Sequence, residues 1–519
     1  MIGVLFPYTA LCSGRILLAA IRRSCSETMV YPVTLADINA WDTLAVVDAP
    51  DEWAVPLIEW MKRPGRKMLM FGKPPVGFAE FLEWRWGSWP EAFEDMAKSP
   101  PATPGRSCSS ALSVIYTGRA ALLGASSWRR PFERFDFSNE WNNLGYGRID
   151  VTNSRWSVST AVDTGVHEIA CIEAHRQSYG SYSALADFSY SALLWFNRSV
   201  GTCDSFEWRL VESFISSYRC EELPCKPVLL EVPLGYDAAV TSRLDCDEDV
   251  ESSRPLFELY HEKGVPFSLA VNTSNLAERR HHRILCEVLD NGGAVLSHTA
   301  THPPRWGGSY EAALKEARIS AFALKEVTGR SPRYAVAPFH HAPHYALQAL
   351  SDVGYSGCIG GIINCDPQFL TARGGRPVGL PEGFVWHSQQ CMLHGDCLQI
   401  NGDPLEIYKS AFDIAKDTKS LFGYLDHPFS ERYAYGWSGE EQRLEIHERF
   451  LDYMTADGRT VLFMDEESAM DFIQYKSKVI ILGQGGEYKI HLPFQEVKYS
   501  LAVEYKGECR AACDGGVVQ

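Results

Sequence analysis

A regular alternation of short apolar runs and amphipathic stretches between about residues 226 and 475 constrains the fold of this chain most strongly. The apolar runs have the length of buried strands and are Val240–Leu244, Phe267–Val271, Ala294–Ser297, Tyr334–Ala337, Leu421–Leu425 and Thr460–Phe463. A helical pattern follows each of the first four, at Pro255–Lys263, Glu278–Asp290, Tyr310–Thr328 and Tyr345–Val353. Repeated strand–helix units of this length predict a (β/α) barrel, whose reactive residues gather at the carboxyl ends of its strands.

Three further regions flank the predicted barrel of residues 226–475. Residues 1–100 also alternate strand and helix signals and predict a small parallel α/β domain. A Pro- and Ser-rich stretch at Lys98–Ser110 indicates a linker, and the short alternating runs of residues 111–225 predict a β-rich region. After about Lys476 the pattern changes to β, so residues 476–519 are expected to form a short C-terminal β segment. The expected fold class is α/β.

The overall charge and the cysteines narrow the class of protein. The 519 residues carry a formal net charge of −16, which argues against a nucleic-acid partner because phosphate backbones bind clustered Lys and Arg. No apolar run reaches the length of a membrane-spanning helix, and the N-terminus lacks the basic start of a signal peptide. The 15 cysteines include no Cys-x-x-Cys pair and indicate reduced thiols, so we expect a cytoplasmic protein.

The first region resembles the flavodoxin-like core of glutamine-amidotransferase-like domains. Its clearest part is a buried strand that ends at Asp48, followed by a helix and a second strand, Lys67–Phe71. The resemblance implies a nucleophilic cysteine in a Gly-rich turn after such a strand. That place reads FGKPP here, without a cysteine. The domain is therefore expected to be a scaffold or a binding module.

Acidic and histidine side chains stand at three predicted strand ends. Asp245 and Asp247 are two residues apart in RLDCDED, so both side chains are expected on one face, where they would share a cation or a proton. His298 and His302 are four apart in SHTATH, a spacing that lets both rings reach one ion. His427 follows a later strand in DHPFSER. Each pattern alone also fits a solvated loop or an incidental histidine pair; their order along one barrel favours a metal site.

This ordered set resembles the NodB-type polysaccharide deacetylases, carbohydrate esterase family 4, over about residues 226–475. The resemblance implies that Asp245 is the catalytic base and that Asp247, His298 and His302 hold one divalent metal ion, with Zn²⁺ expected. It also implies that His427 is the general acid, with Asp396 or Asp426 as its orienting partner.

The chain departs from this family pattern at one motif. The Arg-x-Pro-(Tyr/Phe) motif is matched by VAPFH at 336–340, where Pro338 and Phe339 fit but Val336 replaces the Arg. The base Asp245 would then need its cation from Arg243 or from another basic residue. The backbone N–H of Phe339 is expected to help hold the oxyanion.

Several aromatic side chains are candidates for stacking on sugar rings. Trp306, Phe339, Tyr433 and Trp437 follow the predicted strands, and core packing is the alternative for each. A further segment, residues 193–208, contains Trp195, Arg198 and Asp204, for which an aromatic core edge with an Arg–Asp pair is favoured over a sugar site. His387, His394 and Asp396 could form a second metal site, although His394 and Asp396 are rather expected to line the first.

The resemblance implies a metal-dependent hydrolase that removes an acetyl group from an N-acetylated sugar of a surface polysaccharide or its precursor. The chain also resembles the deacetylase-like proteins of O-antigen and surface-polysaccharide gene clusters. Two alternatives stay open: an amidohydrolase acting on a small amide or ester, and a non-catalytic carbohydrate-binding protein. The expected partner is a carbohydrate substrate, while the oligomeric state is left open.

Overall fold

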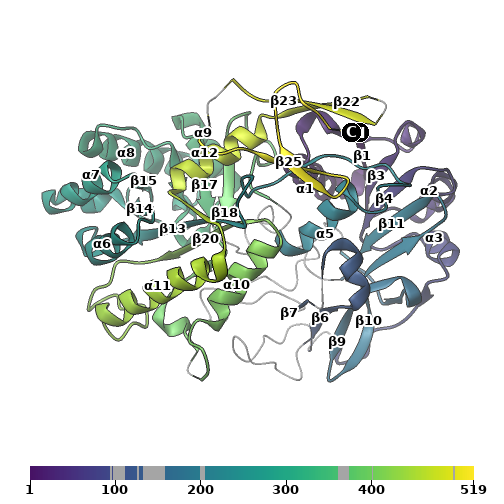
Figure 1. The fold of residues 1–519 in the computed structure, drawn as a ribbon, viewed down its shortest axis with the longest axis horizontal. Coiled ribbons are helices and arrows are strands. Elements are labelled where there is room, and N and C mark those ends of the chain that lie inside the picture. The colour runs from purple at the N-terminus through teal and green to yellow at the C-terminus, as the bar shows by residue number, and fades with distance from the viewer. Residues whose placement is uncertain are drawn as a thin grey trace.

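Two nine-stranded sheets form the framework of the chain and lie side by side in Figure 1. The structure, a computed structural model, describes residues 1–93, 96, 112–125, 128–131, 158–198, 205–360, 373–399, 401–484, 486–494 and 497–518. The predicted linker Lys98–Ser110 and Asp204 of the proposed Arg–Asp pair lie outside these residues.

The first sheet is mixed and has the order β2-β1-β3-β4-β11-β10-β9-β6-β7. Its strands are β1 (Ile2–Leu5), β2 (Val30–Val33), β3 (Thr43–Val47), β4 (Arg66–Phe71), β6 (Ser113–Tyr116), β7 (Arg129–Pro131), β9 (Glu168–Ala174), β10 (Gln177–Asp187) and β11 (Ser191–Phe196). Pairing is parallel from β2 to β11 and antiparallel from β11 to β7. Strands from residues 1–100 and from residues 111–225 thus belong to one sheet, although the sequence suggested two regions. The two sets of strands meet where β11 pairs with β4 and covers an edge that would otherwise expose unpaired backbone groups.

Helices cover both faces of this sheet: α1 (Leu11–Ser24), α2 (Ala54–Met61), α3 (Val76–Phe81) and α5 (Ser205–Ser216). Successive residues of β4 point to opposite faces. Met68 and Met70 belong to the core that contains α2 and α3, whereas Leu69 and Phe71 belong to the core that contains α1 and α5. A two-strand ribbon of β5 (Arg85–Trp86) and β8 (Val162–Asp163) lies beside the sheet.

The second sheet is parallel and curled, with the order β18-β17-β16-β15-β14-β13-β20-β19 and β21 on β13. Its strands are β13 (Ala238–Cys246), β14 (Ser268–Val271), β15 (Ala294–Ser297), β16 (Tyr334–Val336), β17 (Gly357–Gly360), β18 (Val385–Ser388), β19 (Cys391–Met392), β20 (Leu421–Asp426) and β21 (Val461–Met464). The helices around it are α6 (Arg254–Glu262), α7 (His282–Asp290), α8 (Tyr310–Thr328), α9 (His344–Val353), α10 (Glu406–Asp417), α11 (Glu440–Thr455) and α12 (Glu466–Ser477). The barrel expected from the alternating pattern is confirmed, and parallel strands bring their carboxyl ends to one rim.

Helix α8 shows how the local sequence sets these elements. Ser309 precedes it and accepts the N–H of Ala312, as N-cap residues do. Gly329 ends the helix at φ 72°, a left-handed conformation that glycine adopts without steric cost. Both bounds of the helix therefore follow from residues that the sequence displays.

The C-terminal strands tie the two sheets together. β22 (Ile480–Gln484), β23 (Glu487–His491) and β26 (Val517–Val518) form one small sheet, while β24 (Ala502–Tyr505) and β25 (Glu508–Ala511) join β12 (Val228–Leu229). Ser26 and Thr28 donate hydroxyl hydrogen bonds of 2.7 and 2.8 Å to the carbonyls of Val479 and Ile481. The predicted β tail thus packs against the first sheet, near β1 in Figure 1. Among the described residues no helix is long and apolar enough to cross a membrane.

Candidate metal centre

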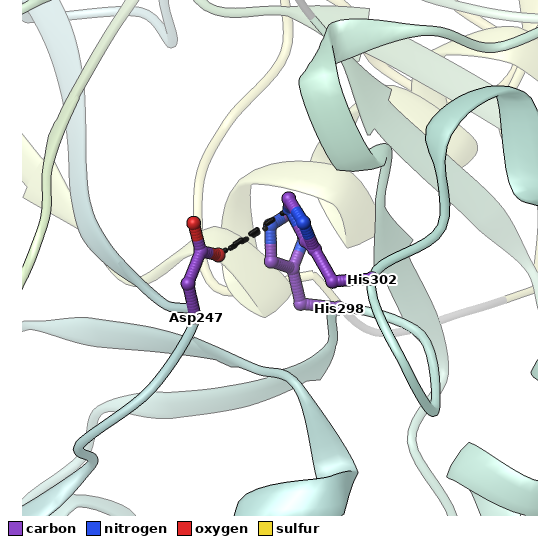
Figure 2. A group of neighbouring side chains, drawn as sticks. All are labelled: Asp247, His298 and His302. Atoms are coloured by element: carbon purple, nitrogen blue, oxygen red, sulfur yellow. Dashed lines mark ion pairs between the residues drawn. The ribbon is translucent and has the colours of Figure 1, made fainter.

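Asp247, His298 and His302 meet at the carboxyl rim of the curled sheet (Figure 2). Asp247 directly follows β13, and His298 directly follows β15. One carboxylate oxygen, Oδ1 of Asp247, lies 3.3 Å from Nε2 of His298 and 3.3 Å from Nε2 of His302. The three residues that sequence spacing selected are therefore brought together.

A backbone carbonyl sets the orientation of the His298 ring. Its Nδ1 lies 3.1 Å from the carbonyl of Val336, which can only accept, so Nδ1 carries a hydrogen and Nε2 is the nitrogen that faces Asp247. Metal-binding histidines commonly donate their second ring N–H in this way. Val336 thus serves the site through its backbone, whatever its side chain.

The loop between His298 and His302 is held by α8. Glu316 accepts the backbone N–H groups of Ala300 and Thr301, each at 2.9 Å. His302 has φ 54° and donates its own N–H to the hydroxyl of Thr299 at 2.9 Å. These contacts turn the loop so that the second histidine faces the same carboxylate as the first.

The chemistry of this donor set fits a divalent cation. Oδ1 of Asp247 is buried, and it has no hydrogen-bond partner within the part of the chain that the structure describes. Burial lowers the pKa of His302 to about 4, with the charge of His298 acting in the same direction, so its ring is neutral at neutral pH and has a lone pair to offer a cation. Burial opposes ionisation of Asp247, but the neighbouring rings of His298, His427 and His302 keep its pKa below the usual value. An anionic oxygen facing two imidazole nitrogens is the set that Zn²⁺ and similar ions prefer.

Asp245 lies deeper than Asp247 and is paired with a cation. Arg243, two residues earlier on β13, donates from Nε to Oδ1 of Asp245 at 2.7 Å, and both side chains are buried. Its Nη1 lies 3.1 Å from Oε1 of Glu466 at the start of α12. Burial would raise the pKa of Asp245, but the charges of Arg243 and His298 hold it well below its usual range. Arg243 thus supplies the cation that Val336 cannot.

His427 faces the opposite side of the Asp247 carboxylate. Its Nε2 is 3.7 Å from Oδ2 of Asp247, and its Nδ1 is 2.9 Å from Nε2 of His394. Tyr435 stacks on the ring at 4.2 Å between centroids. The His427 ring is therefore held at its edge by His394 and on its face by Tyr435.

Asp426 lies next to both His427 and His394. Its Oδ1 accepts the backbone N–H of His427 at 2.7 Å and lies 3.8 Å from Nε2 of His394. Its Oδ2 lies 3.1 Å from Nε2 of His447. Of the two candidates for orienting His427, Asp426 is in place through His394, whereas Asp396 is exposed and lies against the backbone of Gly436.

Residues 237–358 match the sequence model of the family described as Polysaccharide deacetylase. The chain carries a polysaccharide deacetylase domain. The matched segment contains both proposed carboxylates and both proposed histidine ligands, whereas His427 lies beyond it. No curated protein matches the chain.

Solved structures of low sequence identity also resemble the deacetylase domain. A chitin deacetylase from the fungal pathogen Colletotrichum lindemuthianum has 14% identity, covers 46% of this chain and 94% of its own, and has a TM-score of 0.31. A family 4 carbohydrate esterase from Bacillus anthracis has 14% identity, coverages of 46% and 86%, and a TM-score of 0.29. A family 4 acetyl xylan esterase from Clostridium thermocellum, solved with a cobalt ion, has 10% identity, coverages of 43% and 87%, and a TM-score of 0.29. The assignment of the domain rests on the family match.

The sequence did not single out two buried histidines near this rim, His340 and the His447 that contacts Asp426. His340, with φ 56°, lies behind the site, and its Nδ1 is 2.8 Å from Nε2 of Gln389. Burial lowers its pKa to about 3, so the ring is neutral. Gln389 also contacts Arg243 and links His340 to the Asp245 pair. The only sequence signal was its place at the end of VAPFH.

The aromatic candidates separate into exposed and buried groups. Phe339 is 37% exposed, and its ring centroid is 4.6 Å from that of His302, while Pro338 beside it is buried. Trp306 is 0% exposed and donates to the carbonyl of His341 at 2.8 Å; Trp437 is 3% exposed, with Nε1 3.5 Å from Oδ1 of Asp426. The prediction that Trp306 and Trp437 offer surfaces for sugar stacking is therefore wrong. Each ring fills a core and satisfies its N–H, which is the alternative that residue type alone allowed.

Proposed function

We propose that the deacetylase domain is a divalent-metal-dependent hydrolase that removes an acetyl group from an N-acetylated sugar of a surface polysaccharide or its precursor. The observation that carries this proposal is the buried Oδ1 of Asp247, which faces two imidazole nitrogens at 3.3 Å. A base candidate and an acid candidate flank the same carboxylate. Binding alone requires neither of these two groups.

Asp247, His298 and His302 would hold the ion, with Zn²⁺ as the proposed metal. Two histidines and one carboxylate leave coordination positions open for water and for a substrate oxygen. When bound, the ion would supply Lewis-acid chemistry, activating water and polarising the acetyl carbonyl.

Asp245 and His427 would move the protons. Asp245 stays ionised because of Arg243, so it can accept a proton from the attacking water. His427, held by His394 and Tyr435, would protonate the departing sugar amine. The exposed ring of Phe339 beside His302 offers an apolar face to a sugar ring.

The direct test combines elemental analysis with an acetate-release assay on purified full-length protein. We expect close to one divalent ion per chain and acetate release from at least one N-acetylated sugar. The His298→Ala/His302→Ala double variant should lose both the ion and the activity. Full metal occupancy in that variant would disprove the ligand assignment.

The two alternatives give different results in the same assay. Ring opening of small cyclic amides, or acetate release from O-acetyl esters alone, would favour the amidohydrolase. Metal binding without release from any substrate would favour a non-catalytic carbohydrate-binding protein. Two features motivate that last alternative: Val336 in place of the Arg, and the FGKPP turn of the first region without a cysteine. The Arg243–Asp245 ion pair answers the first, because it supplies a cation from another position.

A further inference from the structure

A cavity of about 150 Å³ lies between the N-terminal sheet's helix α1 and the deacetylase domain. Its walls come from α1, from the segment 374–379 that precedes β18, and from the last residues of α12. None of the residues proposed to bind metal or move protons lines this cavity. It is therefore a second place in the molecule where a ligand could be held.

The cavity is strongly basic in a chain whose net charge is −16. The cavity is lined by Arg15, Arg22, Arg23, Arg376 and Lys476, and among the described residues of its lining Glu27 is the one carboxylate. Arg22 and Arg23 lie in the last turn of α1, where cations stabilise the helix dipole. Lys476 likewise lies in the last turn of α12, so the helix dipole leaves Arg15 and Arg376 unexplained.

Lys476 is the most informative of these cations. Its side chain is 2% exposed, and its Nζ has no hydrogen-bond partner among the residues that the structure describes. Burial lowers its pKa, while the carboxylates of Glu231 and Glu212 act in the opposite direction. A buried ammonium group without hydrogen bonds is costly, so a bound acceptor would relieve a real penalty.

The cavity walls are fixed by specific contacts. Arg376 forms an ion pair with Glu27 at 2.9 Å, and Nη1 of Arg23 donates to the backbone carbonyl of Arg376 at 3.2 Å. Gly375 has φ 148°, and a Cβ there would come within 2.9 Å of Cγ of Arg23. The segment is therefore packed closely on α1, and the cations on both sides keep their places without a ligand.

We propose that this cavity binds a small phosphate-bearing molecule through the phosphate or diphosphate group. Such a group carries two or more negative charges on closely spaced oxygens, and guanidinium and ammonium groups are its usual protein partners. A phosphate or diphosphate ligand therefore suits several neighbouring cations better than a ligand with a single carboxylate group does. Residues from α1 and from the deacetylase domain both line the cavity. A bound ligand therefore also stabilises the contact between these two parts of the molecule.

The test is calorimetric titration of the full-length protein with inorganic phosphate and with pyrophosphate at constant ionic strength. The His298→Ala/His302→Ala variant is titrated in parallel, because an anion can also bind a metal ion at the other site. We expect saturable binding of one pyrophosphate per chain in both proteins, with a rise in Tm on binding. Acetate and citrate should not bind comparably.

Amino-acid substitutions in the cavity then test whether the anion binds there. Lys476→Met should weaken pyrophosphate binding by about tenfold or more, since it removes a charged hydrogen-bond donor. The double variant Arg15→Gln/Arg376→Gln tests the same cavity from other walls, should Lys476→Met fail to fold. Lys478→Met is the matched control, because Lys478 closes the same helix but does not line the cavity.

Three results would overturn the proposal. The first is no saturable binding of either phosphate compound in the millimolar range. The second is binding that is lost in the histidine double variant or is unchanged in the cavity variants, which would place the anion elsewhere. The third is citrate binding as tight as that of pyrophosphate, which would show that the ligand class is wrong.

Discussion

Two carboxylates that stand two residues apart have different environments in this protein. Asp245 is buried against Arg243, while Asp247 keeps a side chain that is 24% exposed and faces His298 and His302. A carboxylate held by an arginine can remain ionised as a base, whereas one that faces imidazole nitrogens suits a cation. Their roles therefore follow from their neighbours and not from their spacing.

Exchanging each carboxylate for an amide should separate these two roles. Asp245→Asn should keep the metal and lose most turnover, because an amide cannot accept a proton from water. Asp247→Asn should weaken metal binding itself, because it removes the one anionic ligand of the set. Metal content and acetate release, measured on both variants, check this. Loss of metal in Asp245→Asn with retention in Asp247→Asn would require the two assignments to be exchanged.

Arg243→Met should move the acid limb of the pH–activity profile to higher pH. Burial favours the neutral form of Asp245, and the charge of Arg243 is what keeps its pKa low. Without that charge the pKa rises, and the base is ionised only above a higher pH. Leaving the buried carboxylates of Asp245 and Glu466 without their cation also costs about 3–5 kcal/mol of stability, so Arg243→Lys, which keeps the charge, serves as the control with a smaller shift. An unmoved acid limb of kcat/KM in Arg243→Met would rule out Asp245 as the base.

His427→Ala should bind metal yet lose more activity on amide substrates than on ester substrates. An amine must be protonated to depart, whereas an alkoxide leaves more readily, and general acid catalysis contributes about 10²–10⁴-fold. Parallel rate measurements on an N-acetyl and an O-acetyl substrate check this. Equal losses on both substrates would show that His427 is no general acid.

At the scale of elements, the histidine loop depends on the helix that follows it. β15 delivers His298 directly, but His302 reaches the same carboxylate only because α8 holds the intervening loop through Glu316. A helix residue that touches no ligand is thus part of what shapes the site.

Glu316→Ala should lower metal affinity while leaving the ligands in place. It removes the acceptor for two backbone N–H groups of the loop, and outer-shell partners of metal ligands are worth about 10–100-fold in affinity. Glu311→Ala, an exposed change in the first turn of the same helix, is the matched control. The measurement is metal affinity by competition with a chelator, with circular dichroism to show that the fold is retained. An affinity equal to that of Glu311→Ala would mean that the loop holds its shape without Glu316.

At the scale of the whole molecule, the deacetylase domain is not a separate body. Arg373, from the segment before β18, is paired with Glu212 of α5 at 2.7 Å, and both side chains are 1% exposed. One hydrophobic core also contains residues of α1, α5, α12 and the C-terminal strands. An isolated fragment of residues 226–475 would lose Glu212 and expose that shared core.

Glu212→Gln should therefore destabilise the full chain by about 3–5 kcal/mol, because it leaves the buried charge of Arg373 unpaired. The double variant Glu212→Gln/Arg373→Met removes that charge and should recover much of the loss. Burial disfavours the Glu212 carboxylate, but Arg373 lowers its pKa below the unfolded value. Its contribution is thus present above the unfolded pKa and is lost as pH falls through the folded one.

Urea denaturation of the three proteins at neutral and acidic pH measures both effects. The difference between Glu212→Gln and the unaltered chain should shrink at low pH. A double variant that is no more stable than Glu212→Gln would show that the unpaired charge is not the cause.

The sequence by itself determined the features that depend on neighbours along the chain. Strand Ala294–Ser297 and helix Tyr310–Thr328 have the predicted bounds, because hydrophobic period, the Ser309 cap and Gly329 act within a few residues. The Asp-x-Asp and His-x-x-x-His patterns stand at strand ends for the same reason. Only the tertiary structure decided that β11 pairs with β4, that Arg243 meets Glu466, and that a basic cavity forms between α1 and α12. These partners are more than a hundred residues apart, and such pairing depends on packing and burial across the fold, which local propensity does not encode.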